Sequence, residues 1–244
     1  MRILALESSA APASAAILED GVVIASAWQK TGLTHSQTLL PLAENLLKTA
    51  ALTFADIDVF AVAKGPGSFT GLRIGLAAVK GLAMAVGKPC CGVSTLEGMY
   101  QTLLDGMRPV LNPEAVAVCA MDARVQQVYN ANFDLSNGER LCSDRAVSLE
   151  ELTNELCGMK RPVILVGDGA HLVNETLKAR EDAPAVTLLP EPWRYQSAVG
   201  TAIAAYRMGE AGFVNANALT PEYLRLPQAE RERLARLAAE KQEK

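Results

Sequence analysis

The stretch KGPGSFTGLRIG, residues 64–75, decides which fold this sequence can adopt. It follows an apolar run at residues 57–63, which predicts a buried strand. It leads into an Ala- and Leu-rich segment at residues 72–86, which predicts a helix. Gly65 and Gly67 flank Pro66, so the turn combines two free φ angles with one fixed φ angle. The stretch is therefore a strand, a glycine turn and a helix start.

Two interpretations of this turn are open. Ser68 and Thr70 suit the N-cap of the following helix, and free N–H groups at a helix start attract anions such as phosphate. Alternatively, the glycines serve a tight turn with close packing of the helix on the strand. The stretch matches neither GxGxxG nor a Walker loop, because no GK[ST] follows the glycines.

The predicted helix has one face of small residues. Gly71, Gly75 and Ala78 recur at helical spacing beside Leu72 and Leu76. Small residues at this spacing let a second helix approach closely, as they do in membranes. The alternative is packing on the protein's own sheet, and one helix can do both on opposite faces.

The motif GPGSFTGLRIG, together with ILALESSAAPASAAIL at residues 3–18, resembles the TsaB (YeaZ) family. The resemblance covers residues 1–226, and DAR at residues 122–124 and TPEYLR at residues 220–225 match further motifs of that family. It implies an α/β, actin-like ATPase (ASKHA, ribonuclease H-like) fold with two related halves. We expect these halves at residues 1–108 and 109–195, a returning helix at about 196–226, and a charged tail at 227–244.

The resemblance also implies a function. Members of the family are cytoplasmic partners of TsaD, the enzyme that puts threonylcarbamoyl on tRNA adenosine. Catalytic relatives carry a motif like HMEGH, whose two histidines can reach one metal ion from one helix face. Here Glu97-Gly98 persists, but Thr95 and Met99 stand at the histidine positions. The sequence therefore predicts no metal ligand and no catalytic residue.

A nucleotide site is a weaker expectation. By resemblance, Glu7 ends the first strand where actin-like proteins direct a carboxylate at phosphate or a magnesium-bound water. The alternative for Glu7 is a solvated carboxylate in a turn. The full set expected to bind nucleotide is Glu7, Ser8, Ser9, Gly65, Gly67 and Ser68. The chain itself should require no cofactor, although ATP or ADP could bind weakly here or at the interface of the complex.

The expected partners are TsaD in a heterodimer, the ATPase TsaE, tRNA through the complex, and a second copy when the chain is alone. In the family, helices at residues 36–50 and 70–86 form the docking surface. The residues expected in this interface are His35, Leu39, Leu42, Leu46, Leu72, Arg73, Leu76 and Val79. His35 could instead be a structural residue at a helix start.

Charge, cysteine spacing and hydropathy argue against several classes of function. The net charge of −4 argues against a free-standing nucleic-acid binder, and the five cysteines show no CxxC pair. The sequence predicts neither a signal peptide nor an apolar run of about 20 residues that would span a membrane. An ATP-dependent phosphotransferase of the same fold is the alternative function. A metallopeptidase would need ligands beyond His35 and His171, which are far apart in the sequence.

Overall fold

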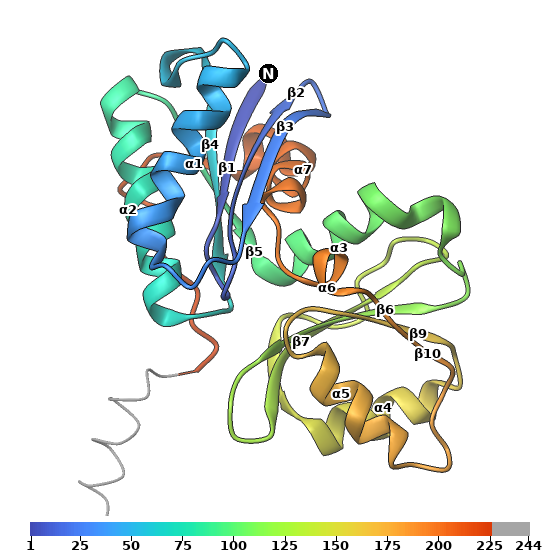
Figure 1. Ribbon diagram of the computed structural model, residues 1–244. Coiled ribbons are helices and arrows are strands. Elements are labelled where there is room, and N and C mark those ends of the chain that lie inside the picture. The colour runs from blue at the N-terminus through green and yellow to red at the C-terminus, as the bar shows by residue number, and fades with distance from the viewer. Residues whose placement is uncertain (226–244) are drawn as a thin grey trace, which may run out of the picture.

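Two units with the same strand order build the chain, as the computed structural model shows for residues 1–225 (Figure 1). The expected tail at 227–244 lies outside the described residues. The first sheet has the order β11-β5-β4-β1-β2-β3 and the second has the order β10-β9-β6-β7-β8. The strands are β1 (Arg2–Glu7), β2 (Ala13–Glu19), β3 (Val22–Gln29), β4 (Val59–Gly65), β5 (Cys90–Ser94), β6 (Val116–Asp122), β7 (Gln127–Asp134), β8 (Arg145–Ser148), β9 (Val163–Val166), β10 (Val186–Leu188) and β11 (Phe213–Val214).

The pairing repeats between the two sheets. In the first, β1 pairs antiparallel with β2 and β2 with β3, whereas β1–β4 and β4–β5 are parallel. In the second, β6–β7 and β7–β8 are antiparallel, whereas β6–β9 and β9–β10 are parallel. Both units thus follow the order 5-4-1-2-3, and β11 adds an edge strand to the first. This repetition confirms the predicted α/β fold with two related halves.

Helices cover both faces of each sheet. They are α1 (His35–Thr49), α2 (Phe69–Val86), α3 (Thr95–Met107), α4 (Leu149–Met159), α5 (Ala170–Lys178), α6 (Glu191–Arg194) and α7 (Ala198–Met208), with 3-10 turns at Phe54–Asp56, Arg108–Val110 and Gly209–Gly212. α1 and α2 pack on one face of the first sheet, and α7 packs on the other. α3 packs on the second sheet, whose far face is covered by α4 and α5.

The two halves meet where α3 crosses α7. At this crossing Gly200 lies against the backbone of Gly98, because a Cβ at Gly200 would overlap the Gly98 carbonyl oxygen. Small residues here let the two helices touch along their backbones. The layers therefore run from α1 and α2, through the first sheet, α7, α3 and the second sheet, to α4 and α5 (Figure 1).

The helix after the glycine motif begins earlier than predicted. α2 starts at Phe69 rather than at residue 72, with Ser68 as N-cap, whose Oγ accepts a hydrogen bond from the Gly71 N–H at 3.2 Å. Thr70 thus lies inside the helix. α2 ends at Val86, and its C-cap Gly87 adopts the left-handed conformation with a φ of 65°.

One helix within the described part of the chain, α2, is long and apolar enough to cross a membrane by length and composition alone. It has 18 residues and includes Arg73 and Lys80, so it is not the apolar run of about 20 residues that the sequence analysis considered. Core helices of proteins that never enter a membrane pass the same test, and α2 packs its buried face on the first sheet. The criterion by itself is therefore weak evidence.

Candidate nucleotide cleft and docking face

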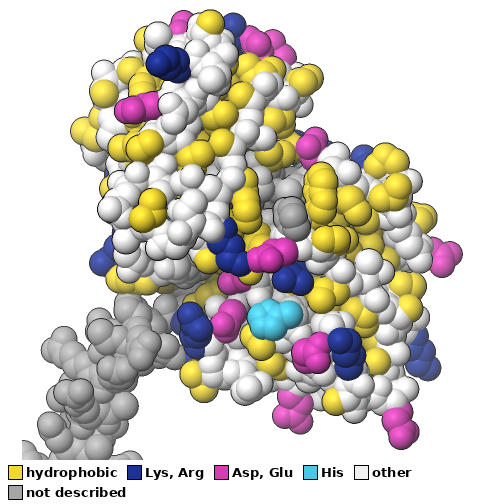
Figure 2. All heavy atoms as spheres, in the orientation of Figure 1, with side chains coloured by type: hydrophobic (Ala, Val, Ile, Leu, Met, Phe, Trp, Pro, Cys, Tyr) yellow, Lys and Arg dark blue, Asp and Glu magenta, His cyan; other side chains and the backbone are white. Residues whose placement is uncertain are grey.

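A cavity of about 610 Å³ lies between the two halves. Its walls come from the loop after β1, the start of α2, the β6–β7 turn, Asp168 and residues 222–225. The lining carries charges of both signs, namely Asp122, Arg124, Asp168, Glu222 and Arg225. Figure 2 likewise shows acidic and basic side chains gathered where the lobes meet. This cleft corresponds in place to the site predicted for a nucleotide.

The small residues of α2 that face inward receive the loop after β1. A Cβ at Gly71 would overlap the Ser8 carbonyl oxygen, and a Cβ at Gly75 would overlap the Ser8 Oγ. Ser8 is 1% exposed, and its Oγ donates to the Gly71 carbonyl at 2.9 Å. The Gly71/Gly75 row is therefore occupied by the protein's own chain and is not open to a partner helix.

The glycines of the turn are used in the same way. A Cβ at Gly65 would overlap the Glu222 carbonyl oxygen, and a Cβ at Gly67 would lie 2.6 Å from the Ser9 carbonyl oxygen. The Ser68 N–H, predicted as free for an anion, donates to that same Ser9 oxygen at 2.7 Å. These contacts support the interpretation of the motif as a tight turn with close packing.

The residues predicted to bind nucleotide divide into two groups. Ser9, Gly67 and Ser68 line the cavity, whereas Glu7, Ser8 and Gly65 do not. Ser9 lines the cavity and is 1% exposed. The structure thus brings half of the predicted set to the cleft, and nucleotide binding itself stays a prediction.

Glu7 is neither a solvated carboxylate nor a group facing the cleft. Its side chain is 1% exposed, and its Oε1 accepts a hydrogen bond from the Ser9 N–H at 2.6 Å. Burial raises the pKa of the Glu7 carboxyl, because desolvation disfavours the charged form. The interpretation of Glu7 as a solvated carboxylate is therefore wrong, and its role at a nucleotide stays a prediction.

Two buried side chains that are not histidines occupy the place of the histidine pair. Thr95 and Met99 are each 1% exposed, and Met99 belongs to the core between α3 and the second sheet. A Cβ at Gly167 would lie 2.5 Å from the Met99 Cε, so the thioether reaches the glycine turn of the second half. Glu97 is bound elsewhere, by Arg140 at 2.9 Å. Over residues 1–225, no group of three or more His, Cys, Asp or Glu side chains is arranged to hold a metal ion.

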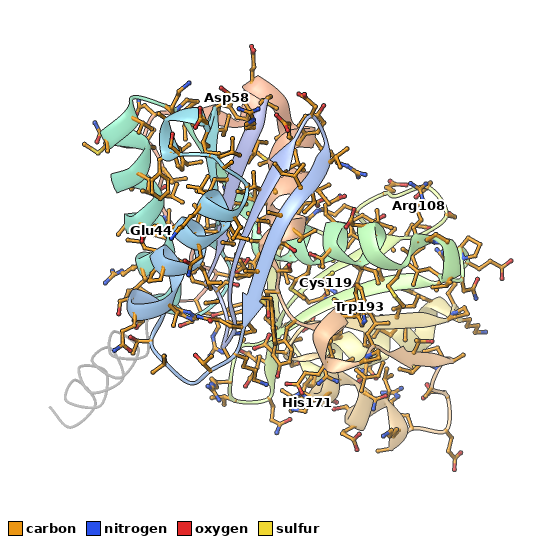
Figure 3. The ribbon with its side chains drawn as sticks, turned by 45° about the horizontal axis from the view of Figure 1, so that its top comes forward. Glu44, Asp58, Arg108, Cys119, His171 and Trp193 are labelled. Carbon is orange, nitrogen blue, oxygen red and sulfur yellow. The ribbon has the colours of Figure 1, made fainter. Side chains whose placement is uncertain are left out.

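Each of the two histidines lies within hydrogen-bond distance of a backbone carbonyl oxygen. The His35 Nε2 lies 2.8 Å from the Ala10 carbonyl oxygen, and the His171 Nδ1 lies 2.8 Å from the Asp168 carbonyl oxygen. His35 is half-buried and lines the cleft, which favours its structural interpretation over a partner contact. Figure 3 shows His171 on the second half, in α5, far from α1.

Asp168 lies in the turn between β9 and α5 and lines the cavity. Burial raises the pKa of its carboxyl, and the Gln196 Nε2 donates to its Oδ1 at 2.9 Å. Asp122 forms an ion pair with Arg124 at 3.4 Å. The carboxylates of Asp122 and Asp168 both line the cavity.

Comparisons with known proteins agree with this geometry. A family model described as TsaD: tRNA N6-adenosine threonylcarbamoyltransferase matches residues 29–241. The tRNA threonylcarbamoyladenosine biosynthesis protein TsaB of Bacillus subtilis (strain 168) is 30% identical over 242 residues, covering 94% of this chain and 96% of that protein. The chain belongs to the TsaB (YeaZ) family.

Two further relatives extend this assignment. The TsaB of Escherichia coli (strain K12) is 38% identical over 133 residues, which span 54% of this chain and 55% of that protein. The crystal structure of YeaZ from Pseudomonas aeruginosa superimposes with a TM-score of 0.75 at 27% identity, covering 91% of this chain and 99% of that one. The similarity thus extends over both halves of the TsaB-family chain.

Most of the residues predicted for the docking interface lie inside the first half. Leu39, Leu46, Leu72, Leu76 and Val79 are at most 8% exposed and pack in one core with strands of the first sheet. They cannot contact a partner while the protein is folded, so this part of the prediction is wrong. The physical reason is that the apolar stripe of each helix is buried against the first sheet.

Other side chains of the same helices face outward. On α2, Arg73 is exposed as predicted, and Ala77, Gly81, Met84 and Ala85 share its exposed side. Met84 is 65% exposed, and a Cβ at Gly81 would meet nothing within 4 Å. Ala77, Gly81 and Ala85 form a second small-residue row, with a spacing of four residues. The sequence contained both rows, but only the fold shows which one faces out.

The outward side of α1 continues this surface. Leu40 is 37% exposed, Pro41 and Glu44 are exposed, and Leu42 is half-buried. Figure 3 shows Glu44 on the side of α1 away from the second half. In Figure 2 the surface over α1 carries few charged side chains among hydrophobic and uncharged atoms. We call the exposed sides of α1 and α2, namely Leu40, Pro41, Glu44, Arg73, Ala77, Gly81, Met84 and Ala85, the docking face.

Proposed function

We propose that this TsaB-family chain is a non-catalytic subunit that acts with the transferase TsaD and the ATPase TsaE to form threonylcarbamoyladenosine in tRNA. The observation that carries the proposal is the burial of Thr95 and Met99 at the histidine positions, within a chain whose relatives are named for this biosynthesis. In this proposal TsaD transfers threonylcarbamoyl from threonylcarbamoyl-AMP to the adenosine next to the anticodon. The present chain stabilises the active form of TsaD and meets tRNA through the complex.

TsaD binds to the docking face in this proposal. The row Ala77, Gly81 and Ala85 lets a helix of the partner approach the α2 backbone, as small residues do in other helix pairs. Exposed Met84 and Leu40 would then lose contact with water, which is the main source of affinity at the centre of such interfaces. A second copy of the chain uses the same face when TsaD is absent.

The chain needs no nucleotide of its own under this proposal. Ser8, Ser9 and Glu222 fill the space that the motif glycines leave open, and Glu7 is enclosed. A direct phosphotransferase would need a carboxylate that reaches the phosphate. Calorimetric titration with ATP, ADP and Mg²⁺ should therefore give weak binding or none, and tight magnesium-dependent binding with turnover would favour the phosphotransferase.

Reconstitution tests the function. TsaD and TsaE are assayed with tRNA and threonylcarbamoyl-AMP in the presence and absence of this chain. We expect modification only when the chain is present. Full activity of TsaD and TsaE without it, or modification by this chain without TsaD, would refute the proposed role.

A matched pair of glycine variants tests the docking face. Gly81→Gln on α2 and Gly158→Gln on α4 both place a helix-favouring side chain in open space on an exposed helix surface. Both proteins should remain folded. Gly81→Gln should abolish co-elution with TsaD, whereas Gly158→Gln should leave it unchanged. Equal co-elution of the two variants would exclude this surface.

A further inference from the structure

The last described segment, residues 220–225, crosses the mouth of the cleft from the first half to the second. It leaves the first half at Leu219, which is 3% exposed and whose carbonyl oxygen accepts a hydrogen bond from the Lys80 Nζ at 3.1 Å. The residues of the segment that line the cleft are Glu222, Tyr223, Leu224 and Arg225. The segment therefore starts in the core of the first half and lines the cleft between the two halves.

One anchor of the segment lies on the first half. The Glu222 N–H donates to the Lys64 carbonyl oxygen at 2.7 Å, and the two side chains form an ion pair at 3.1 Å. The Tyr223 ring packs on Phe69 with a centroid distance of 4.7 Å, and its hydroxyl oxygen accepts from the Arg73 Nε at 3.1 Å. These contacts hold the segment to the end of β4 and the first turns of α2.

The other anchor lies on the second half. The Arg225 guanidinium donates to the carbonyl oxygens of Ala123 and Arg124, the latter at 3.4 Å. This is where the β6–β7 turn begins, with Arg124, Val125 and Gln126 at φ values of 65°, 53° and 55°. Valine rarely adopts this conformation, because its branched side chain meets the backbone. Val125 is 79% exposed, so no packing of its side chain explains the turn, and the bonds from Arg225 contribute to holding it.

We propose that residues 220–225 form a latch that holds the two halves together across the cleft and keeps the cleft closed. The two anchors act in series: each binds one half, and the chain between them joins the halves at this edge. The crossing of α3 and α7 at Gly98 and Gly200 provides a buried contact about which the halves can rotate when the latch is free. Release of either anchor should then open the cleft.

Distance measurements between the halves test the latch. Spin labels are placed at Lys48→Cys on α1 and Glu181→Cys after α5, two exposed positions in different halves, in a Cys142→Ser background. The cysteines that remain are buried. Pulsed dipolar spectroscopy then compares the protein with its latch intact, Tyr223→Ala, Arg225→Gln and the double variant. Arg180→Gln is the control, because the contacts of the Arg180 guanidinium within residues 1–225 are with Asp182, Asn154 and Cys157, which all belong to the second half.

The series arrangement gives a definite pattern. Arg225→Gln removes the anchor on the second half and should shift the interlabel distance to longer values and broaden its distribution, and the double variant should match it, since a latch released at one end is already open. Tyr223→Ala keeps the contacts between Glu222 and Lys64, so its shift should be no larger than that of Arg225→Gln. Arg180→Gln should leave the distribution unchanged. Unchanged distances in both single variants, or effects that add in the double variant, would overturn the latch. Urea unfolding of each variant verifies that the population measured is folded.

Discussion

The glycines of α2 offer a test of why the motif needs them. Gly71, Gly75 and Gly81 lie in one helix, so the helix-propensity term for replacement by alanine is the same, about 0.5–1 kcal/mol in favour of alanine. What differs is the space around each Cβ. At Gly81 nothing lies within 4 Å, whereas at Gly71 and Gly75 the Cβ would overlap atoms of Ser8. The three variants therefore separate propensity from packing.

The expected signs are opposite. Gly81→Ala should raise the free energy of unfolding by about 0.5–1 kcal/mol. Gly71→Ala must displace the Ser8 backbone, and forced overpacking of this kind costs about 1–3 kcal/mol or more, which outweighs the propensity gain. For a protein of this size each kcal/mol corresponds to about 2–4 °C in Tm, so urea and thermal unfolding resolve the difference.

A second substitution distinguishes backbone from side-chain overlap. At Gly75 the overlapping atom is the Ser8 Oγ, while the Ser8 Cβ lies at 3.8 Å, so Ser8→Ala should recover most of the stability lost in Gly75→Ala. At Gly71 the overlapping atom is the Ser8 carbonyl oxygen, which Ser8→Ala leaves in place. Rescue at Gly75 without rescue at Gly71 is the expected result. If Gly71→Ala stabilised the protein as Gly81→Ala does, the explanation of the motif as a packing device would be wrong.

Three further predictions follow from burial. Leu76 is buried, so Leu76→Ala should lower the free energy of unfolding by about 2–5 kcal/mol. The next residue, Ala77, is exposed, so Ala77→Glu should change the free energy of unfolding by less than about 0.5 kcal/mol. Equal losses of the two variants in urea unfolding would contradict the orientation of α2. Burial raises the pKa of the Glu7 carboxyl in the folded protein above the unfolded value of about 4.5, so folding stability falls as the pH rises from the unfolded pKa to the folded pKa. In that pH range the free energy of unfolding should fall by up to about 1.4 kcal/mol per pH unit relative to the Glu7→Gln variant. Parallel curves of stability against pH for the two proteins would disprove this. Of the five cysteines, Cys142 is the one that is not buried, whereas burial raises the thiol pKa of the other four, Cys90, Cys91, Cys119 and Cys157. Titration of the folded protein with a thiol reagent should therefore show one thiol that reacts fast. Several fast-reacting thiols would contradict the burial of the other four.

Local sequence was sufficient for the order of the elements but not for the direction that each face takes. The run at residues 57–63 and the glycine turn predicted a strand and a helix, and β4 and α2 stand there. The same pattern placed Leu72 and Leu76 in an interface, because apolar periodicity marks a face that is buried without saying what covers it. The sheet beneath α2 covers that face, and only tertiary structure could show this.

Glu7 illustrates the other limit of sequence interpretation. A carboxylate at the end of a first strand can point to a ligand or into the protein, and both positions have the same neighbours in the sequence. What decides between them is α7, which lies almost two hundred positions away in the chain and closes the first sheet on the side of Glu7. A contact of that sequence separation leaves no local signal, so the sequence could not have excluded the cleft.

The glycine motif and the latch belong to one arrangement. Gly67, Gly71 and Gly75 hold the loop after β1 against α2, and Gly65 makes room for the Glu222 backbone that begins the crossing to the second half. The motif glycines contact two segments of the chain itself, the loop after β1 and the Glu222 backbone. Because Arg73 belongs to the docking face and also donates to Tyr223, the surface proposed for TsaD and the proposed latch share one side chain. The contacts that hold the loop after β1 against α2 therefore also fix the helix that carries the proposed docking face.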